Sequence, residues 1–160
     1  MAIRILKEVS RDGGRLPAAG ASVIAGMVLE LASGAVQPYA ETTALTEPWG
    51  LASDSNVTQP LQGAGGLTAG VGFDYTNFNR GGLIGAFQNG GVYELYNDGT
   101  GNPMVTAPAT AYAENEPLYS TNAGLVTTDA AISQSKLGTV LSVANAGSAT
   151  AMRLQLKLSI

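Results

Sequence analysis

The chain has 160 residues, of which 45% are hydrophobic and only 12% are charged, and its formal net charge is −4. This length and composition favour one compact β-rich domain with a real core, and they exclude a disordered acidic tail or a coiled coil. The absence of Cys and His excludes disulfides, thiol nucleophiles, Cys/His zinc sites and His-based acid–base catalysis.

Residues 1–22 form a basic segment ahead of an acidic body. They hold four basic and two acidic residues, which gives 4 − 2 = +2, whereas the rest gives 4 − 10 = −6. Ile3 and Ile5 alternate with polar residues, so a short edge strand is possible there. We predict an extended N-terminal arm that meets an acidic surface, with a solvated terminus as the alternative. Its candidate contact residues are Ile3, Arg4, Ile5, Lys7, Arg11 and Arg15.

The body, residues 23–160, is predicted to be a single β-rich domain. It begins with a strand in which Met27, Leu29 and Leu31 alternate. Another strand starts at Trp49, the only Trp, which we expect in the core or in a subunit contact. A glycine-rich insertion follows at about residues 58–101. It lacks the Lys of a phosphate-binding loop and the dinucleotide fingerprint, so we interpret its glycines as turns.

The second part of the body contains the clearest strand signals. The apolar run 83–87, the turn Asn89-Gly90-Gly91 and the run 92–96 predict a hairpin, with Tyr93 and Tyr96 on opposite faces. Residues 152–160 alternate strictly between apolar and polar, which predicts a half-buried strand. A helix over 125–134 is possible but weakly supported because β-branched residues disfavour it.

Two stretches of the chain echo each other. Gly34 and Gly124 close similar turns, and Gly50 and Gly138 open similar strands, at separations of 124 − 34 = 90 and 138 − 50 = 88 residues. The echo could mark a duplication. We favour strands from the two ends of the chain meeting in one barrel, with the C-terminal strand closing against the N-terminal half.

Chemical motifs are weak throughout. Glu114 and Glu116 form a carboxylate pair without other signs of a glycosidase, and the segment 98–102 lacks the ligand pattern of a calcium loop. The acidic body opposes nucleic-acid binding, and no apolar run approaches the roughly 18 residues of a membrane span. The sequence therefore predicts a protein that is not an enzyme and has no metal, cofactor, nucleic acid or membrane partner.

The arrangement of glycines and apolar alternation resembles the capsid decoration, or cement, proteins of tailed bacteriophages. The resemblance covers roughly residues 23–57 and 116–160 and rests on these runs: 26–31, Pro48-Trp49-Gly50-Leu51-Ala52, 117–119, 123–126, 137–141 and 154–158. It implies an all-β fold with little helix, a small β-barrel or β-tulip, without catalytic activity. It also implies a structural role in which an oligomer stabilises an expanded capsid by bridging its subunits.

The resemblance also implies the partners and the location of the protein. The partners would be the major capsid protein and the chain itself, as a homotrimer rather than a homodimer, with Trp49, Tyr93 and Tyr96 as possible subunit contacts. The protein would be made in the bacterial cytoplasm and would lie on the outer capsid surface of the virion. We expect strand addition by residues 3–6 to set the register on the capsid, while the basic arm residues pair with capsid carboxylates.

A second interpretation belongs to another class. A β-rich receptor- or glycan-binding module of a tail fibre or adhesin would show an aromatic and carboxylate patch around Tyr93, Tyr96 and Asp98. A glycan array would separate this function from capsid decoration.

Overall fold

The computed structural model describes residues 3–40, 47–53, 55, 83–97, 99, 102–106, 112–130 and 136–160, which form strands and no helix. The predicted all-β class is confirmed, but the strands form two antiparallel sheets rather than a closed barrel. The five-stranded sheet has the order β2-β6-β5-β3-β4 and the six-stranded sheet the order β1-β7-β11-β10-β8-β9. The strands are β1 (Ile3–Lys7), β2 (Ser10–Arg15), β3 (Val28–Ala32), β4 (Ala35–Pro38), β5 (Gly50–Ala52), β6 (Ile84–Gln88), β7 (Val92–Tyr96), β8 (Pro117–Ser120), β9 (Val126–Thr127), β10 (Lys136–Ala144) and β11 (Arg153–Leu158).

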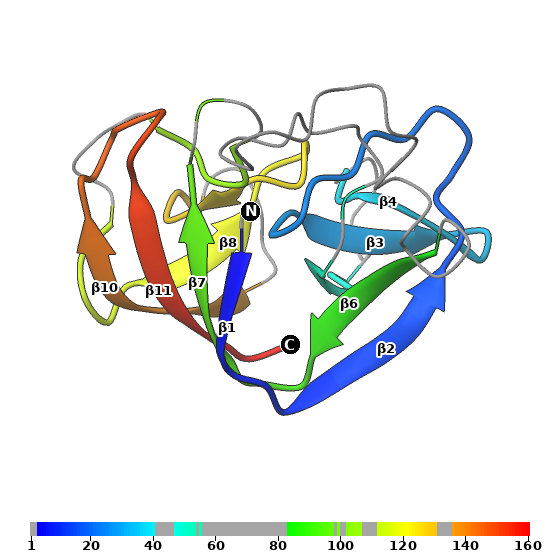
Figure 1. Cartoon of the computed structure of the whole chain (residues 1–160), viewed down its shortest axis with the longest axis horizontal. Helices are drawn as coiled ribbons and strands as arrows, with labels where there is room; N and C mark the ends of the chain where they lie inside the picture. The colour runs from blue at the N-terminus through cyan, green and yellow to red at the C-terminus, as the bar shows by residue number, and fades with distance from the viewer. Residues whose placement is uncertain are drawn as a thin grey trace, which may run out of the picture.

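A bent two-stranded ribbon joins the two sheets (Figure 1). Ile3 of β1 pairs with Leu95 of β7 in one sheet, and Ser10 of β2 pairs with Gln88 of β6 in the other. The two pairs are seven residues apart on each strand, 10 − 3 and 95 − 88, so the two segments stay in step around the corner although the register shifts locally between Ile5 and Lys7. The chain therefore changes sheets at the same corner twice, between β1 and β2 and again between β6 and β7.

This ribbon corrects two predictions. The runs 83–87 and 92–96 are strands as expected, but they do not form a hairpin, because β6 and β7 belong to different sheets. The segment predicted as an arm is extended, yet its two strands pair with β7 and β6. It is therefore built into both sheets of the body.

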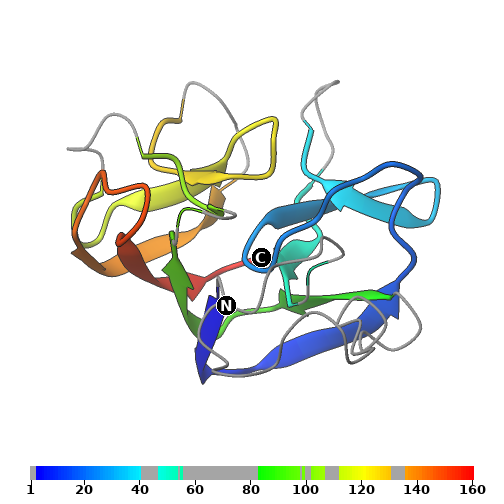
Figure 2. The ribbon, with the colours of Figure 1, turned by 45° about the horizontal axis from the view of Figure 1, so that its top comes forward.

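The two sheets share one topology. In the five-stranded sheet, β2 pairs with β6, and β5 lies between β6 and β3; in the other sheet, β7 pairs with β11, and β10 lies between β11 and β8. The hairpins β3–β4 and β8–β9 complete the match, and β1 is an extra strand on β7. We call β2–β6 unit 1 and β7–β11 unit 2; Figure 2 shows them side by side.

Backbone hydrogen bonds recur at equivalent positions of the units. The Gly26 amide donates to the Ala52 carbonyl (2.8 Å) in unit 1, and the Asn115 amide donates to the Val140 carbonyl (2.9 Å) in unit 2. The equivalent residues are separated by 115 − 26 = 89 and 140 − 52 = 88 positions, which match the spacing of the sequence echo.

A further equivalence lies at the edge of each unit. After the first strand of unit 1, Pro17 forms a parallel bridge with Val36 of β4. After the first strand of unit 2, Met104 forms the same kind of bridge with Val126 of β9. In both units, the segment that follows the first strand therefore covers the edge strand of the hairpin.

The glycine echo thus marks a duplicated unit. Gly34 and Gly124 have positive φ values, 83° and 71°, in the turns of the β3–β4 and β8–β9 hairpins. A Cβ at Gly50 or at Gly138 would collide with a backbone carbonyl oxygen of the neighbouring strand, β6 or β11. The interpretation of the echo as two chain ends meeting in one barrel is wrong, because β11 pairs within its own unit, with β7 and β10.

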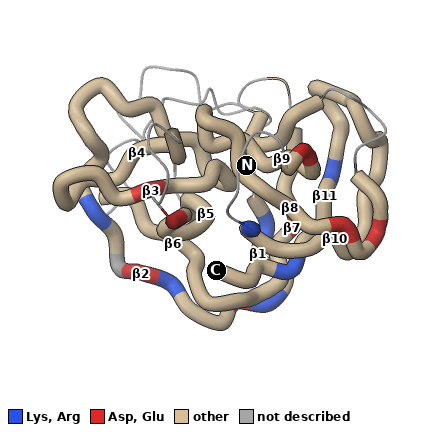
Figure 3. Tube along the Cα trace, turned by 180° about the vertical axis from the view of Figure 1, so that it is seen from behind, with Lys and Arg blue, Asp and Glu red and all other residues tan. Residues whose placement is uncertain are grey.

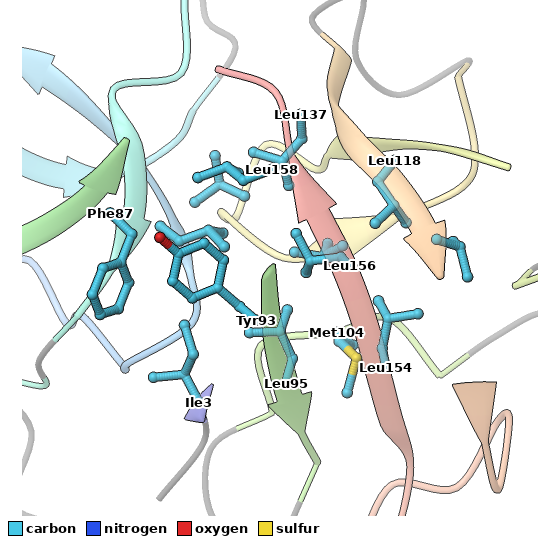
Figure 4. Packing of buried hydrophobic residues seen from close by; sticks show 14 of the residues in the cluster. Ile3, Phe87, Tyr93, Leu95, Met104, Leu118, Leu137, Leu154, Leu156 and Leu158 are labelled. Atoms are coloured by element: carbon cyan, nitrogen blue, oxygen red, sulfur yellow. The ribbon is translucent and has the colours of Figure 1, made fainter. Parts of the chain in front are cut away.

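Two apolar clusters hold the fold together. The small cluster is the interior of unit 1: Val23, Leu29, Val36, Ala52, Ile84 and Ala86, with Trp49 packed against it. The large cluster combines the interior of unit 2 with Ile3 and with unit 1 residues on the opposite face of its sheet, Val28, Leu51 and Phe87 among them. Phe87 and Tyr93 meet where the units join, with ring centroids 4.7 Å apart (Figure 4). Burial of one face of unit 1 against unit 2 therefore joins the two sheets.

Candidate binding surface

The residues predicted for the arm divide into exposed and buried ones along β1. Arg4, Ile5 and Lys7 are exposed. Ile3 is only 5% exposed and packs in the large cluster, so its side chain serves the core and only its backbone lies on the β1 edge. No described strand pairs with the outer edge of β1, because this strand is the last in its sheet.

The two arginines of β2 interact within unit 1. The Arg11 guanidinium donates to the Ser53 hydroxyl (2.9 Å) and lies 5.5 Å from the centre of the Phe87 ring. Arg15 forms an ion pair with Asp12 at 3.6 Å. The Arg11 side chain is thus engaged in the fold, whereas Arg15 keeps a side chain that is 52% exposed.

The three predicted subunit contacts have different environments. Tyr93 is 0% exposed, which rules out the predicted subunit contact for its side chain. Trp49 is half-buried against the small cluster, as expected for a packing residue. Tyr96 is half-buried on the opposite face of β7 from Tyr93, and that alternation was predicted correctly.

The outer face of unit 2 gathers basic residues from both ends of the chain. Strand pairing aligns three rows across β1, β7, β11 and β10. The rows are Lys7–Val92–Lys157–Thr139, Arg4–Glu94–Gln155–Ser142 and Tyr96–Arg153–Ala144. We call this surface the basic face: its four cations and one anion give 4 − 1 = +3 on a chain of −4. Figure 3 shows the basic positions along the trace.

A hydrogen-bond network fixes the one anion of the basic face. Glu94 accepts hydrogen bonds from the Tyr96 hydroxyl and from the Gln155 amide (2.8 Å), and it is 7% exposed. These hydrogen bonds, that of Tyr96 first, lower the pKa of Glu94, and the charges of Arg4 and Arg153 add to the effect against the opposing influence of burial. Because Glu94 is buried and the four cations are exposed, the charges that a partner meets on the basic face are cationic.

The same network sets the position of Tyr96. The Arg153 guanidinium lies 5.3 Å from the centre of the Tyr96 ring, within the range of a cation–π contact. Burial, and then the hydrogen bond to Glu94, raises the pKa of Tyr96. Tyr96 therefore remains protonated at neutral pH and continues to donate to Glu94.

Arg153 and Lys157 were not among the residues singled out from the sequence. Their signal is the alternation of residues 152–160, which places both on the polar side of the last strand. Their nearness to Arg4 and Lys7 depends on pairing across β7 between segments some 150 positions apart, 153 − 4 = 149. The local sequence pattern alone therefore could not reveal that these four cations share one surface.

The described residues contain no group of three or more His, Cys, Asp or Glu side chains that could hold a metal ion. Within the same ranges, no helix is long and apolar enough to cross a membrane. Glu116 accepts a hydrogen bond from the Ala113 amide (3.1 Å), so it stabilises a turn. Of the predicted glycan patch, Tyr93 is buried and Asp98 lies outside the described residues.

Comparison with known proteins yields no relative: no family model matches the chain, and no match was found among curated proteins or solved structures.

Proposed function

We propose that this protein is a structural virion protein that binds the outer surface of an expanded phage capsid and stabilises it by bridging capsid subunits. The observation that carries the proposal is the outer edge of β1, where exposed apolar and basic side chains accompany an edge that no described strand covers. An extended partner segment can add to such an edge through backbone hydrogen bonds. Ile5 and Leu6 would supply apolar contact, and Arg4 and Lys7 would pair with carboxylates.

The stabilising effect follows from linkage. A ligand that binds only the expanded capsid shifts the equilibrium toward that state, and several attachment points slow its release. Attachment as a homo-oligomer, a trimer in this proposal, would supply these points. Such a role needs a rigid body with a docking edge and no catalytic group. The ribbon provides the rigidity, because it pairs β1 with the core strand β7.

The experiment mixes the purified protein with undecorated expanded capsids and measures bound copies per capsid by sedimentation. We expect saturable, stoichiometric binding, and no binding would overturn the function. Leu6→Glu places an acidic group on the β1 edge and should weaken binding at least about tenfold, since like charges oppose docking on an acidic surface. Leu31→Glu is the matched control, because Leu31 on β3 belongs to the other sheet and is similarly exposed, 40% against 42% for Leu6.

A further inference from the structure

The two units use the same face of their sheets differently. In unit 1, Leu51 of β5 pairs with Phe87 of β6, and both side chains are buried in the large cluster. The equivalent pair in unit 2 is Thr139 of β10 and Lys157 of β11. Lys157 is exposed and Thr139 is half-buried. The face that binds the neighbouring unit in unit 1 is therefore open and charged in unit 2.

The charged side chains on the open face disfavour binding of an apolar surface or of a second basic face. An apolar surface such as that of unit 1 would desolvate four cations without compensation, which is costly. The same face of a second copy would bring like charges together. The basic face is therefore unsuited to packing against another unit in the way that unit 1 packs against unit 2.

The positions of the cations on the basic face favour binding of an acidic surface. Lys7 and Lys157 flank Val92 directly across β7, whereas Arg4 pairs with Glu94 and Arg153 with Tyr96, so the two arginines face each other diagonally across β7. With strands about 4.8 Å apart, the two cations of each pair stem from strands about 10 Å apart. Arg guanidinium groups bind carboxylates through paired hydrogen bonds. A cationic area of this width fits a carboxylate-rich protein surface.

We propose that the basic face is a docking surface for a carboxylate-rich protein surface, to which the C-terminal strand contributes through Arg153 and Lys157. On the proposed function, on which this inference rests, that partner is the capsid exterior. The basic face lies beside the β1 edge, because Arg4 and Lys7 belong to both. One partner can therefore engage the edge and the face together.

The test removes the two charges of β11 from the intact protein. Arg153→Gln with Lys157→Gln should weaken binding to expanded capsids about tenfold and reduce the salt dependence of that binding, because screened ion pairs are lost. Lys136→Gln removes one cation outside the three rows; it is compared with Arg153→Gln alone and should bind like the unchanged protein. Arg153→Lys with Lys157→Arg keeps the charge and should retain binding. Thermal unfolding checks that each variant is folded.

A second measurement separates this inference from the proposed function. Immobilised poly-L-glutamate and heparin serve as the probes. Binding to poly-L-glutamate that is lost in the Arg153→Gln/Lys157→Gln variant would support the acidic protein partner even if capsids are not bound. Undiminished capsid binding by that variant would overturn the inference and leave the function standing. Binding to heparin alone would also overturn it, in favour of an anionic glycan.

Discussion

Units 1 and 2 have the same strand order but differently filled interiors. Ala52 and Ala86 pair across β5 and β6 in unit 1, where unit 2 has the pair Val140 and Leu156 across β10 and β11. Unit 1 therefore gains less from burial of its own interior. On the opposite face of β3, the face of Val28, unit 1 also buries the carboxylate of Glu30, of which one oxygen accepts from the Gln37 amide (2.6 Å) and the other has no hydrogen-bond partner among the described residues.

The difference shows how one copy of a duplicated unit can come to depend on the other copy for its stability. Unit 1 compensates for its small interior through its opposite face, since Phe87 and Leu51 pack into the cluster that includes the interior of unit 2. Unit 2 does not need its equivalent face for packing, so that face is available for charged residues. We infer that unit 2 carries most of the stability and that unit 1 folds upon it.

Replacing a large interior side chain of unit 2 by the small one found at the equivalent position of unit 1 should have the largest effect on stability. Leu156→Ala places in unit 2 the residue found at the equivalent position 86, and it should cost about 3–5 kcal/mol of unfolding free energy through lost burial and the remaining cavity. Urea denaturation measures the change. The ribbon runs through both sheets, so we expect one transition for the whole chain.

The converse change, Ala86→Leu, tests the interior of unit 1. Added methylene groups should strain this interior by about 1–3 kcal/mol if it is already close-packed. Stabilisation by Ala86→Leu would contradict the packing described for unit 1. Two separate transitions in either variant would contradict the dependence of unit 1 on unit 2.

A substitution at the corner between the units should have the next largest effect on stability. Gly91 has φ 102°, and a Cβ there would lie 2.5 Å from the Tyr93 hydroxyl and 2.7 Å from the Lys7 carbonyl oxygen. Gly91→Ala should therefore cost about 2–4 kcal/mol, since backbone strain and collision add. Thermal or urea unfolding gives the value.

Gly90 provides the matched control at the same corner. Its φ is 96°, but the nearest atom to an added Cβ would be 3.8 Å away. Gly90→Ala should cost only about 1 kcal/mol, from backbone conformation alone. Equal losses of unfolding free energy in Gly91→Ala and Gly90→Ala would show that the collision expected at Gly91 adds nothing to the cost of its backbone conformation.

The sequence predicted strands better than it predicted their partners. The alternation in residues 152–160 and the run 92–96 identified β11 and β7, because period-two burial is a local signal. Asn89-Gly90-Gly91 was interpreted as a hairpin turn, although the same residues also suit a corner between sheets. Only pairing with the distant β1 and β2 distinguishes these outcomes.

The candidate surface was partly predictable for the same reason. Arg4 and Lys7 were selected from the charge of the first residues, and both are exposed. Arg11 was selected on the same basis, but the ring of Phe87 and the hydroxyl of Ser53 hold it within unit 1. Charge counts along the chain cannot separate these cases, because they depend on what the folded sheet places opposite each guanidinium.

Removal of a buried tyrosine hydroxyl from unit 2 should have the smallest effect on stability; unit 1 has a valine at the equivalent position. Tyr112 lies five residues before β8, as Val23 lies five before β3 (117 − 112 and 28 − 23). The buried Tyr112 hydroxyl is 2.7 Å from the Val126 carbonyl oxygen and 2.9 Å from that of Val105, so it can donate to either. Tyr112→Phe should cost about 1–2 kcal/mol of unfolding free energy, because buried acceptors lose their donor.

The same hydroxyl predicts an alkaline effect. Burial raises the pKa of Tyr112 far above its ordinary value of 10.0, so its contribution is fully present below about pH 10 and is lost as pH rises, when the unfolded state releases the proton. Unfolding free energy measured from pH 8 to 11 should fall less steeply for Tyr112→Phe than for the unchanged chain. Equal slopes for Tyr112→Phe and the unchanged chain would show that unit 2 does not depend on this buried hydroxyl.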